Sequence, residues 1–351
     1  MGIIQTTKPV RKGEELPEEK IKQFLLEQQL LNSIQSELNV SQFSNGYSNL
    51  TYLLQIEDKE LVLRRPPFSA PKRGHDMGRE YNVLKHLNPI FNKAPKVHGF
   101  CEDTTLIGAP FYIMEKVDGI ILTAKSAHQK QVTPKAFKTI ANTWLDTFVA
   151  FHQIDYKAAG LTDLGRPEGY VERQVRNWGK QYLAAATDDV AVATKVMAWM
   201  QEQQPKHYDH SLIHNDFKYD NVVFKDDSWS EITAILDWEM CTLGDPLMDL
   251  GTSLGYWTTV TDPDVMKRGL PSPTVMEGNP SRTDLVQEYA LKSGKSIDNL
   301  VFYYVYGLFK IAVIAQQIYY RYKHGHTQDP KFAHLNKASE LCCNTAWQAI
   351  Q

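Results

Sequence analysis

Residues 212–221 read Leu212-Ile-His-Asn-Asp-Phe-Lys-Tyr-Asp-Asn221, and this stretch decides the fold. Asp216 and Asn221 are five positions apart, the spacing at which a phosphoryl-transfer loop places a base beside a hydroxyl and an amide oxygen on Mg²⁺. Sixteen residues past Asn221, Asp237 follows the apolar pair Ile235-Leu236, where a second metal-binding carboxylate is expected. The ordered set predicts a phosphoryl-transfer site.

The chemistry of that reaction explains these residue types. Mg²⁺ bound to ATP prefers hard oxygen ligands, which Asn221 and Asp237 would supply. The carboxylate of Asp216 would orient the attacking hydroxyl and accept its proton. His214 follows two apolar residues, so we expect it to support the loop from a partly buried position rather than act as the base.

These residues resemble the aminoglycoside phosphotransferase and choline kinase family of small-molecule kinases. Its signature is His-Gly-Asp-x-x-x-x-Asn with an Asp on the next strand, and Asn215 replaces the glycine here. Asn is the non-glycine residue that best tolerates positive φ. Asp-Trp-Glu at 237–239 and Gly-Asp-Pro-Leu-Met-Asp-Leu at 244–250 look like the phosphotransferase-like domains fused to some acyl-CoA dehydrogenases. The resemblance spans nearly the whole chain.

The resemblance implies an α+β, bilobal, protein-kinase-like fold and the cofactors ATP and Mg²⁺. We expect a small, β-rich N-lobe at residues 1–116 that binds nucleotide. A larger helical C-lobe at residues 117–351 would carry the catalytic loop, the metal site and the substrate-binding helices.

Composition agrees with a globular enzyme of this size. The chain has 351 residues, 42% of them hydrophobic and 23% charged, and a net charge of −3 that argues against a nucleic-acid partner. Its four cysteines fit no metal-binding spacing, so a reducing cytoplasm is the expected compartment. Because no uncharged apolar run reaches the ~18 residues that span a bilayer, we expect no membrane association. The oligomeric state is unknown.

The expected N-lobe contains a helix near 17–31 and then a β-turn-β over 43–54, whose turn amides could approach ATP phosphates. Arg64 stands where kinases generally carry a phosphate-gripping lysine, and Glu80 on the next helix is its expected partner. Arg65 and Arg79 are expected at the surface. The turn residues predicted to bind nucleotide are Ser44, Asn45, Gly46, Ser48 and Asn49.

Residues 111–116 predict a buried strand that leads to a turn at Val117-Asp-Gly119. By analogy with a hinge, the backbone of Met114, Glu115 and Lys116 would contact adenine. The simpler interpretation, a core strand, is preferred for their side chains.

The expected C-lobe is helical, with apolar stripes over 137–151, 171–182, 300–322 and 333–349. Asp245 and Asp249 begin another helix, in which Asp249 is expected to be structural. The Pro/Gly-rich segment 261–282 is the candidate for a mobile substrate loop.

We therefore expect phosphorylation of a hydroxyl on a small molecule, by an enzyme whose Asp216 is catalytic. A hydroxyacyl compound is one acceptor: Tyr256 and Trp257 could line its apolar part, and Lys267, Arg268 and Arg282 could meet an anionic tail. An inactive nucleotide-binding pseudokinase or interaction module stays open, because Asn215 and Arg64 depart from the usual pattern. A metal-dependent hydrolase would need more His or carboxylate ligands than this segment offers. The role of Glu239 is open.

Overall fold

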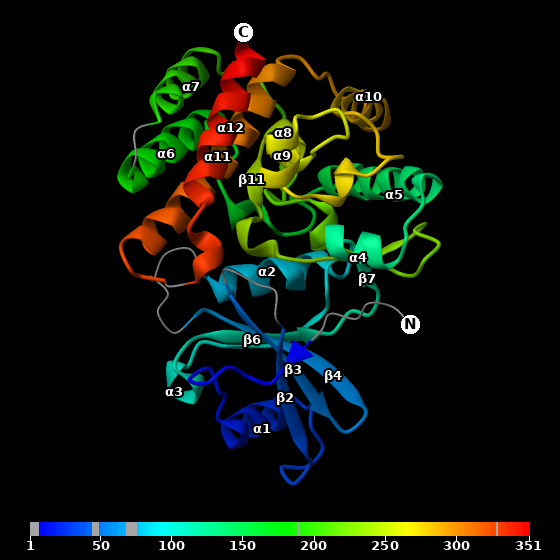
Figure 1. The fold of residues 1–351 in the computed structure, drawn as a ribbon. Helices are drawn as coiled ribbons and strands as arrows, with labels where there is room; N and C mark the ends of the chain where they lie inside the picture. The colour runs from blue at the N-terminus through cyan, green and yellow to red at the C-terminus, as the bar shows by residue number, and fades with distance from the viewer. Residues whose placement is uncertain (1–6, 44–48, 68–75, 188–189, 328) are drawn as a thin grey trace. The chain divides into compact units, whose positions relative to one another are not determined.

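The computed structural model describes residues 7–43, 49–67, 76–187, 190–327 and 329–351, which form two compact units (Figure 1). The first unit draws on Met1–Ile121, Ala158–Leu164 and Asn221–Cys241, and is rich in strands. The second draws on Leu122–Lys157, Gly165–Asp220 and Thr242–Gln351, and is mostly helical. The α+β class is confirmed. The units do not divide at one boundary near residue 116, because two later segments return to the first unit.

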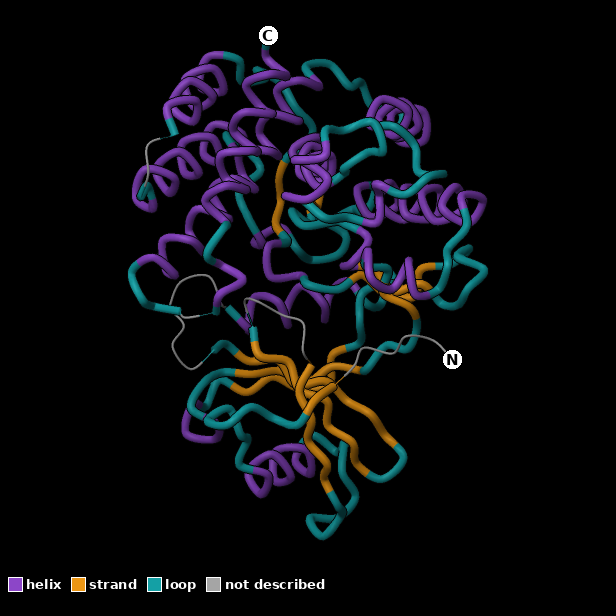
Figure 2. Tube along the Cα trace, viewed as in Figure 1, coloured by secondary structure: helices purple, strands orange, loops and turns teal. Residues whose placement is uncertain are grey.

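The first unit is built on an antiparallel sheet with strand order β1-β2-β3-β4-β6-β5 (orange in Figure 2). Neighbouring strands are connected by hydrogen bonds in antiparallel register, such as Leu54 opposite Leu61 across the β3–β4 hairpin. Alternation along β4 places Leu61 and Leu63 in the apolar core with α1. The strands are β1 (Thr7–Lys8), β2 (Leu38–Phe43), β3 (Leu50–Ile56), β4 (Lys59–Arg65), β5 (Val97–Cys101) and β6 (Phe111–Glu115).

Helices complete this unit. α1 (Glu18–Glu27) inserts Ile21, Phe24 and Leu25 into the sheet's core, and Phe24 meets Phe111 edge to face at 4.9 Å. α2 (Met77–Leu87) is capped at its N-terminus by Asp76, whose side chain accepts from the amide of Arg79. A short helix, α3 (Thr104–Ile107), separates β5 from β6.

The two arginines at the end of β4 are both buried. Alternation directs them to opposite faces, and Arg64 is 8% exposed. Arg65, expected at the surface, is 1% exposed, and this expectation is wrong. Its guanidinium donates to the carbonyls of Ile107 at 2.7 Å and Pro66 at 3.1 Å, so backbone acceptors replace water around the charge.

A second, three-stranded sheet explains why residues 221–241 belong to the first unit. β9 (Val222–Phe224) pairs with β10 (Ile232–Ile235) on one side and with β7 (Ile120–Ile121) on the other. A Cβ at Gly119, beside β7, would lie 2.3 Å from the Phe224 carbonyl oxygen, so only glycine allows this approach. Asn221 and Asp237 flank this sheet.

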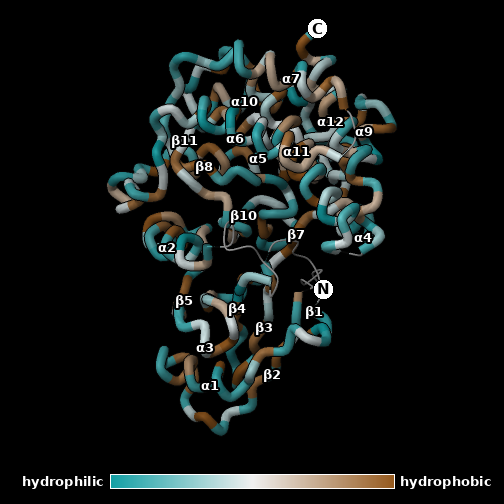
Figure 3. The backbone as a smooth tube through the Cα atoms, turned by 90° about the vertical axis from the view of Figure 1, so that its left-hand side faces the viewer, coloured by the Kyte–Doolittle hydropathy of each residue, from teal (hydrophilic) through white to brown (hydrophobic). Residues whose placement is uncertain are grey.

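The second unit packs helices around a two-stranded ribbon. β8 (Ser211–Ile213) and β11 (Thr242–Gly244) pair antiparallel, and β8 is drawn in the hydrophobic colour in Figure 3. Its helices are α4 (Ala124–Gln129), α5 (Pro134–His152), α6 (Tyr170–Ala185), α7 (Ala191–Glu202), α8 (Pro246–Tyr256), α9 (Asp264–Gly269), α10 (Arg282–Ser293), α11 (Leu300–Lys323) and α12 (Leu335–Ile350). Short 3₁₀ turns add Thr162–Leu164 and Trp238–Met240 to the first unit and Pro273–Val275 and Pro330–Phe332 to the second. A further 3₁₀ turn, Tyr219–Asn221, lies where the chain passes from the second unit to the first.

α8 and α11 cross at two glycines. A Cβ at Gly307 would lie 1.9 Å from the carbonyl oxygen of Gly251, and one at Gly251 would lie 2.1 Å from the Tyr303 carbonyl oxygen. The absence of side chains lets the two backbones touch. This crossing places both helices close beneath the loop that follows β8.

The helix α11 confirms the long apolar helix that the sequence predicts over 300–322. Its 24 residues, with a mean hydropathy of 1.3 over the best window, would suffice by length and composition to cross a membrane. However, 72% of that window is buried within the fold, which is typical of a core helix. Its burial explains the apolar composition without a bilayer.

Candidate active site

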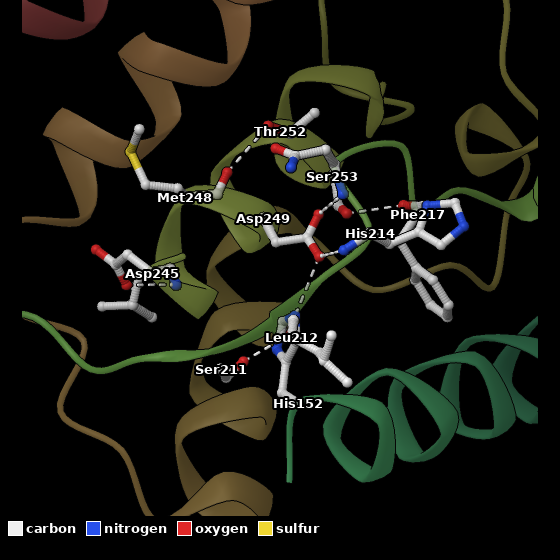
Figure 4. A network of polar contacts seen from close by, with 12 residues as sticks. His152, Ser211, Leu212, His214, Phe217, Asp245, Met248, Asp249, Thr252 and Ser253 are labelled. Carbon is white, nitrogen blue, oxygen red and sulfur yellow. Dashed lines mark hydrogen bonds and ion pairs between the residues drawn. The ribbon is translucent and has the colours of Figure 1, made fainter. Parts of the chain in front are cut away.

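The loop after β8 is held by a buried carboxylate. Asp249 on α8 is fully buried and accepts the backbone amide of His214 at 2.5 Å (Figure 4). It also accepts the backbone amide of Asn215 at 2.7 Å. These bonds fix the Ile213–His214 and His214–Asn215 peptide groups, which precede the Asn215–Asp216 peptide. Asn215 has φ of 67°, the left-handed conformation that Asn accepts better than most residues. Replacing the signature glycine therefore leaves the loop in a glycine-like conformation.

A second residue of α8 holds the other side of Asp216. The Ser253 hydroxyl donates to the Phe217 carbonyl at 2.7 Å. Asp249 and Ser253 are one helical turn apart and lie on one face. α8 thus binds the backbone on both sides of Asp216 and supports the loop that follows β8.

His152 of α5 completes the environment of Asp249. Its Nε2 lies 3.2 Å from Asp249, and its Nδ1 lies 2.8 Å from the Tyr289 hydroxyl. Burial lowers the pKa of His152, so the neutral ring donates from Nε2 and accepts from Tyr289 at Nδ1. Although burial raises the pKa of Asp249, the hydrogen bonds from His152 and the His214 amide outweigh it and lower the pKa. The lowered pKa favours the ionised form of Asp249.

The side chain of Asp216 is paired with a lysine. Its Oδ2 lies 2.8 Å from Lys218 Nζ, which also lies 4.9 Å from the centre of the Tyr256 ring. Burial alone lowers the pKa of Lys218, but Asp216 and Asp220 overcome this effect and raise it well above the usual value. The carboxylate of Asp216 thus has a positive charge beside it.

His214 fills the interior behind this loop. Its residue is fully buried, and its ring meets Phe217 and Phe151 edge to face, with centroids 5.9 and 6.4 Å away. This packing agrees with the expected supporting role.

In the first unit, Arg64 joins two carboxylates. Its Nη1 is hydrogen-bonded to Glu80 Oε1, and its Nη2 lies 3.1 Å from Asp237 Oδ1. The expected ion pair with Glu80 is confirmed, and Asp237 is an additional partner. Burial lowers the pKa of Arg64, but Glu80 above all, with Tyr112 and Asp237, raises it well above its usual value. Arg64 is therefore a buried, permanently charged group whose position is fixed by two acids.

Asn221 and Asp237, the predicted metal ligands, belong to the same unit. The carbonyl of Asn221 accepts the amide of Leu236 at 2.8 Å, which holds the residue before Asp237 beside Asn221. Asp237 has φ of 64°, and its side chain is 36% exposed. Its Oδ2 has no hydrogen-bond donor among the described residues.

An accessible carboxylate oxygen beside an amide fits the oxygen preference of Mg²⁺. The described part of the chain holds no group of three or more His, Cys, Asp or Glu residues that could bind a metal alone. The oxygens of Asp237 and Asn221 suit an ion that also binds phosphate oxygens. The described residues do not provide the cluster of His or carboxylate ligands that a metal-dependent hydrolase would need.

The remaining nucleotide-binding predictions have different outcomes. Ser44, Asn45, Gly46 and Ser48 lie outside the described residues. Asn49 is 4% exposed and donates from Nδ2 to Glu239 Oε2 at 2.9 Å, so Glu239 anchors the residue that precedes β3.

The predicted hinge strand is present as β6, with Met114 paired opposite Val62. The amide of Glu115 already donates to Lys96, and the Lys116 amine contacts Glu60 and Asp118, each at 2.5 Å. Contact of this backbone with adenine stays a prediction.

The residues suggested for an acceptor are partly committed to the fold. Arg282 makes two bonds to Asp262, at 3.0 and 2.6 Å, and is not free to meet an anionic tail. Trp257 is 2% exposed and packs at 5.3 Å from Trp144, so it belongs to the core. The segment 261–282, expected to be a mobile substrate loop, contains α9 and a 3₁₀ turn. Arg79, expected at the surface, is partly buried and donates to the Cys241 carbonyl at 3.0 Å.

Several residues around the catalytic loop escaped the sequence analysis. Ser253 lies one turn from Asp249, a spacing that could have revealed it. Lys218 stands two positions after Asp216, inside the quoted motif. Lys310 carried no local signal, because it lies within the apolar pattern of α11.

The chain matches the family profile described as "Phosphotransferase enzyme family" over residues 39–270, and it belongs to that family. Among solved structures, a protein of Ralstonia eutropha JMP134 with a provisional name as an aminoglycoside phosphotransferase is 27% identical, with a TM-score of 0.80, over 95% of this chain and 98% of that one. Choline kinase from Cryptosporidium parvum Iowa II has a TM-score of 0.64 at 13% identity over 94% of each chain, which shows the fold alone. The protein-kinase-like fold is confirmed.

Curated relatives are longer proteins. Mouse acyl-CoA dehydrogenase family member 10 is 32% identical over 98% of this chain and 32% of its own length. Chicken acyl-CoA dehydrogenase family member 11 is 34% identical over 90% of this chain and 42% of its own length. The chain thus spans about a third to two fifths of these relatives. Together the comparisons support a small-molecule phosphotransferase, and they confirm the resemblance drawn from the motifs.

Proposed function

We propose that this protein transfers the γ-phosphoryl group of ATP, with Mg²⁺, to a hydroxyl group of a small molecule. The observation that carries this proposal is the ion-pair network in which buried Arg64 joins Glu80 to Asp237. A permanent cation fixed beside a carboxylate that keeps one oxygen accessible is suited to phosphate and metal. A structure of a thermostable mutant of aminoglycoside phosphotransferase APH(4)-Ia in complex with AMP-PNP and hygromycin B has the same fold, with a TM-score of 0.58 at 15% identity, and gives precedent for a nucleotide.

Asn221 and Asp237 would hold the metal. Bound Mg²⁺ would neutralise phosphate charge during transfer. Asp237 offers Oδ2, since Oδ1 is bound to Arg64. The nucleotide would also meet Ser44, Asn45, Gly46, Ser48 and Asn49 and the backbone of Met114–Lys116.

Asp216 would orient the acceptor hydroxyl and take its proton as the oxygen–phosphorus bond forms. Its backbone is held on both sides by α8, so little conformational freedom is lost when the acceptor binds. Lys218 would place positive charge beside the reacting group.

For the acceptor we propose a hydroxyacyl compound. Support comes from the relatives named as acyl-CoA dehydrogenases, in which a region like this chain is part of a longer protein. Among the proposed contacts, Lys267 pairs with Asp264 at 2.9 Å and Arg268 is exposed, while Arg282 is excluded by its bonds to Asp262. We propose no nucleic-acid or membrane partner, and a cytoplasmic location in keeping with four free, buried cysteines.

The second candidate is a nucleotide-binding module without turnover. Arg64 in place of lysine and Asn215 in place of glycine favour it. The retained Asp216 favours an enzyme, since a pure binding module has no need of a hydroxyl-orienting carboxylate.

A screen of phosphate transfer to several acceptors distinguishes the phosphotransferase from the nucleotide-binding module. Purified protein with Mg²⁺ and γ-labelled ATP is offered hydroxyacyl thioesters, free hydroxy acids, choline and kanamycin, with Asp216→Asn as the control. We expect label on a hydroxyacyl compound with the unaltered protein only. Nucleotide binding with no transfer to any class would favour the binding module, and a preference for kanamycin would overturn the proposed acceptor.

A further inference from the structure

A lysine is buried directly behind the catalytic loop. Lys310 lies in the middle of α11, is 1% exposed, and is surrounded along its helix by apolar residues. Its Nζ donates to the Asn215 carbonyl at 2.6 Å and to Asn215 Oδ1 at 3.1 Å. The Trp178 ring lies 5.8 Å from the same amine, within the range of a cation–π contact. Two acceptors and one ring face thus account for its three hydrogens.

Asn215 is bound through every polar group it has. Its amide donates to Asp249, its carbonyl and Oδ1 accept from Lys310, and its Nδ2 lies 3.3 Å from the Tyr170 hydroxyl. These partners come from α8, α11 and α6. A residue in a left-handed conformation is therefore fixed from three helices, far beyond what tolerance of positive φ requires.

Burial of this amine removes it from water, and this desolvation costs free energy that an apolar side chain would not lose. Among the described residues, Lys310 forms no ion pair, and it is held by a carbonyl and an amide oxygen only. Burial lowers its pKa from 10.5 to about 8, although Asp249 and Asp216 oppose the shift. A methionine would fit the surrounding core at no such cost. The lysine is thus better explained by what it holds than by packing.

The atom that Lys310 holds has a direct link to the catalytic residue. The Asn215 carbonyl and the Asp216 amide belong to one planar peptide group. Fixing that carbonyl fixes the plane from which the Asp216 side chain projects. We propose that Lys310 is a positioning residue that sets the direction of the Asp216 carboxylate by holding the Asn215–Asp216 peptide, with Asn215 and Tyr170 as its partners.

This inference rests on the proposed function for its kinetic consequence, but its structural part can be measured without an acceptor. Hydrogen exchange of peptides covering 211–221 reports directly on the loop. Hydrolysis of Mg·ATP, with water as acceptor, supplies kcat and the KM for ATP.

The main variant is Lys310→Met. Its matched control is Gln316→Met, on the same helix, where a buried amide donates to the Ala185 carbonyl at 2.8 Å, away from the loop. We expect Lys310→Met to speed exchange in 211–221 and to lower kcat by ~10- to 10²-fold, as misplacement of a catalytic group does, with little change in KM. Gln316→Met should lower the melting temperature without either effect.

Two further variants keep the test decisive. Tyr170→Phe removes one bond to Asn215 at almost constant volume and should produce a smaller change of the same kind, even if Lys310→Met folds poorly. In an Asn215→Gly background there is no side chain at this position to bind, and glycine adopts positive φ without strain. Lys310→Met should therefore change the exchange of 211–221 and kcat less in that background than in the unaltered protein.

Unchanged exchange of 211–221 in both Lys310→Met and Tyr170→Phe would overturn the inference, whether or not the protein hydrolyses ATP. Equal loss of kcat in Lys310→Met and Gln316→Met would also overturn it, because a general loss of stability would then explain both. If the unaltered protein has no turnover but the exchange pattern is as expected, the proposed function fails while the positioning role of Lys310 stands.

Discussion

The guanidinium of Arg64 lies 3.1 Å from the carboxylate of Asp237, although the two residues are 173 positions apart in the chain. A strand of the six-stranded sheet is thereby tied to the segment that follows the three-stranded sheet. The same arginine is hydrogen-bonded to Glu80 through its other terminal nitrogen. Only a planar, forked cation can serve both acids in this way.

Arg64→Lys should therefore raise the KM for ATP by about tenfold, because a single ammonium cannot keep both carboxylates in place. The matched control is Arg65→Lys. That neighbour is equally buried but binds only the backbone carbonyls of Ile107 and Pro66, so its loss should lower stability and leave the KM unchanged. Steady-state kinetics and thermal melting on both variants separate the effects; equal KM values would contradict the role given to Arg64.

Asp216→Asn should lower kcat by ~10²-fold or more and leave ATP affinity nearly intact, because the amide keeps the shape but cannot accept a proton. Asp226→Asn is a control, since this exposed carboxylate lies in the β9–β10 turn and binds the Ser228 amide. Turnover of Asp216→Asn at the unaltered rate, measured with an identified acceptor, would remove Asp216 from the mechanism.

Asp237→Ala should weaken binding of Mg·ATP, and Asn221→Ala should do so to a smaller degree, because a carboxylate contributes charge that an amide lacks. Titration calorimetry with Mg²⁺ and then with EDTA isolates the metal-dependent part. The variants should differ from the unaltered protein only when Mg²⁺ is present. Identical affinities in both conditions would show that neither side chain holds the metal.

The sequence was sufficient to predict features within single elements and contacts that follow from the order of the motifs. Alternation along β4 predicted that Arg64 and Arg65 face opposite ways, and the motif order correctly paired Arg64 with Glu80. It could not predict that Arg65 is also buried. The acceptor is a carbonyl at Ile107, 42 positions away, and nothing in the pattern of a strand indicates where a distant backbone carbonyl will lie.

The contacts that support the loop after β8 could likewise not be predicted from the sequence, because they join residues that are far apart in the chain. Asp249 was expected to be structural, yet its two bonds to the loop depend on how α8 packs beneath β8. Lys310 is separated from Asn215 by 95 positions and falls within a helix that periodicity marks as core. Propensity and spacing describe single elements, whereas these contacts arise from the crossing of α8 and α11, which two glycines permit.

The low pKa of Lys310 predicts how stability depends on pH. The folded-state pKa, about 8, is below the value of 10.5 for an exposed lysine, so the unfolded chain binds the proton more tightly between these limits. The contribution of Lys310 to the free energy of unfolding should therefore rise as the pH rises across that window, and it should be lost as the pH falls through about 8. The slope should approach about 1.4 kcal/mol per pH unit. The charged groups that act on this amine are Asp249, Asp216 and Lys218.

Urea unfolding at several pH values between 7 and 10 measures this dependence. The free energy of unfolding of the unaltered protein, relative to that of Lys310→Met, should increase through the window, because methionine has no proton to lose. Gln316→Met keeps Lys310 and should follow the unaltered protein, displaced by a constant amount. Parallel curves for the unaltered protein and Lys310→Met would mean that Lys310 has the same proton affinity in both states, and that the buried amine beside Asn215 is not held in the environment described.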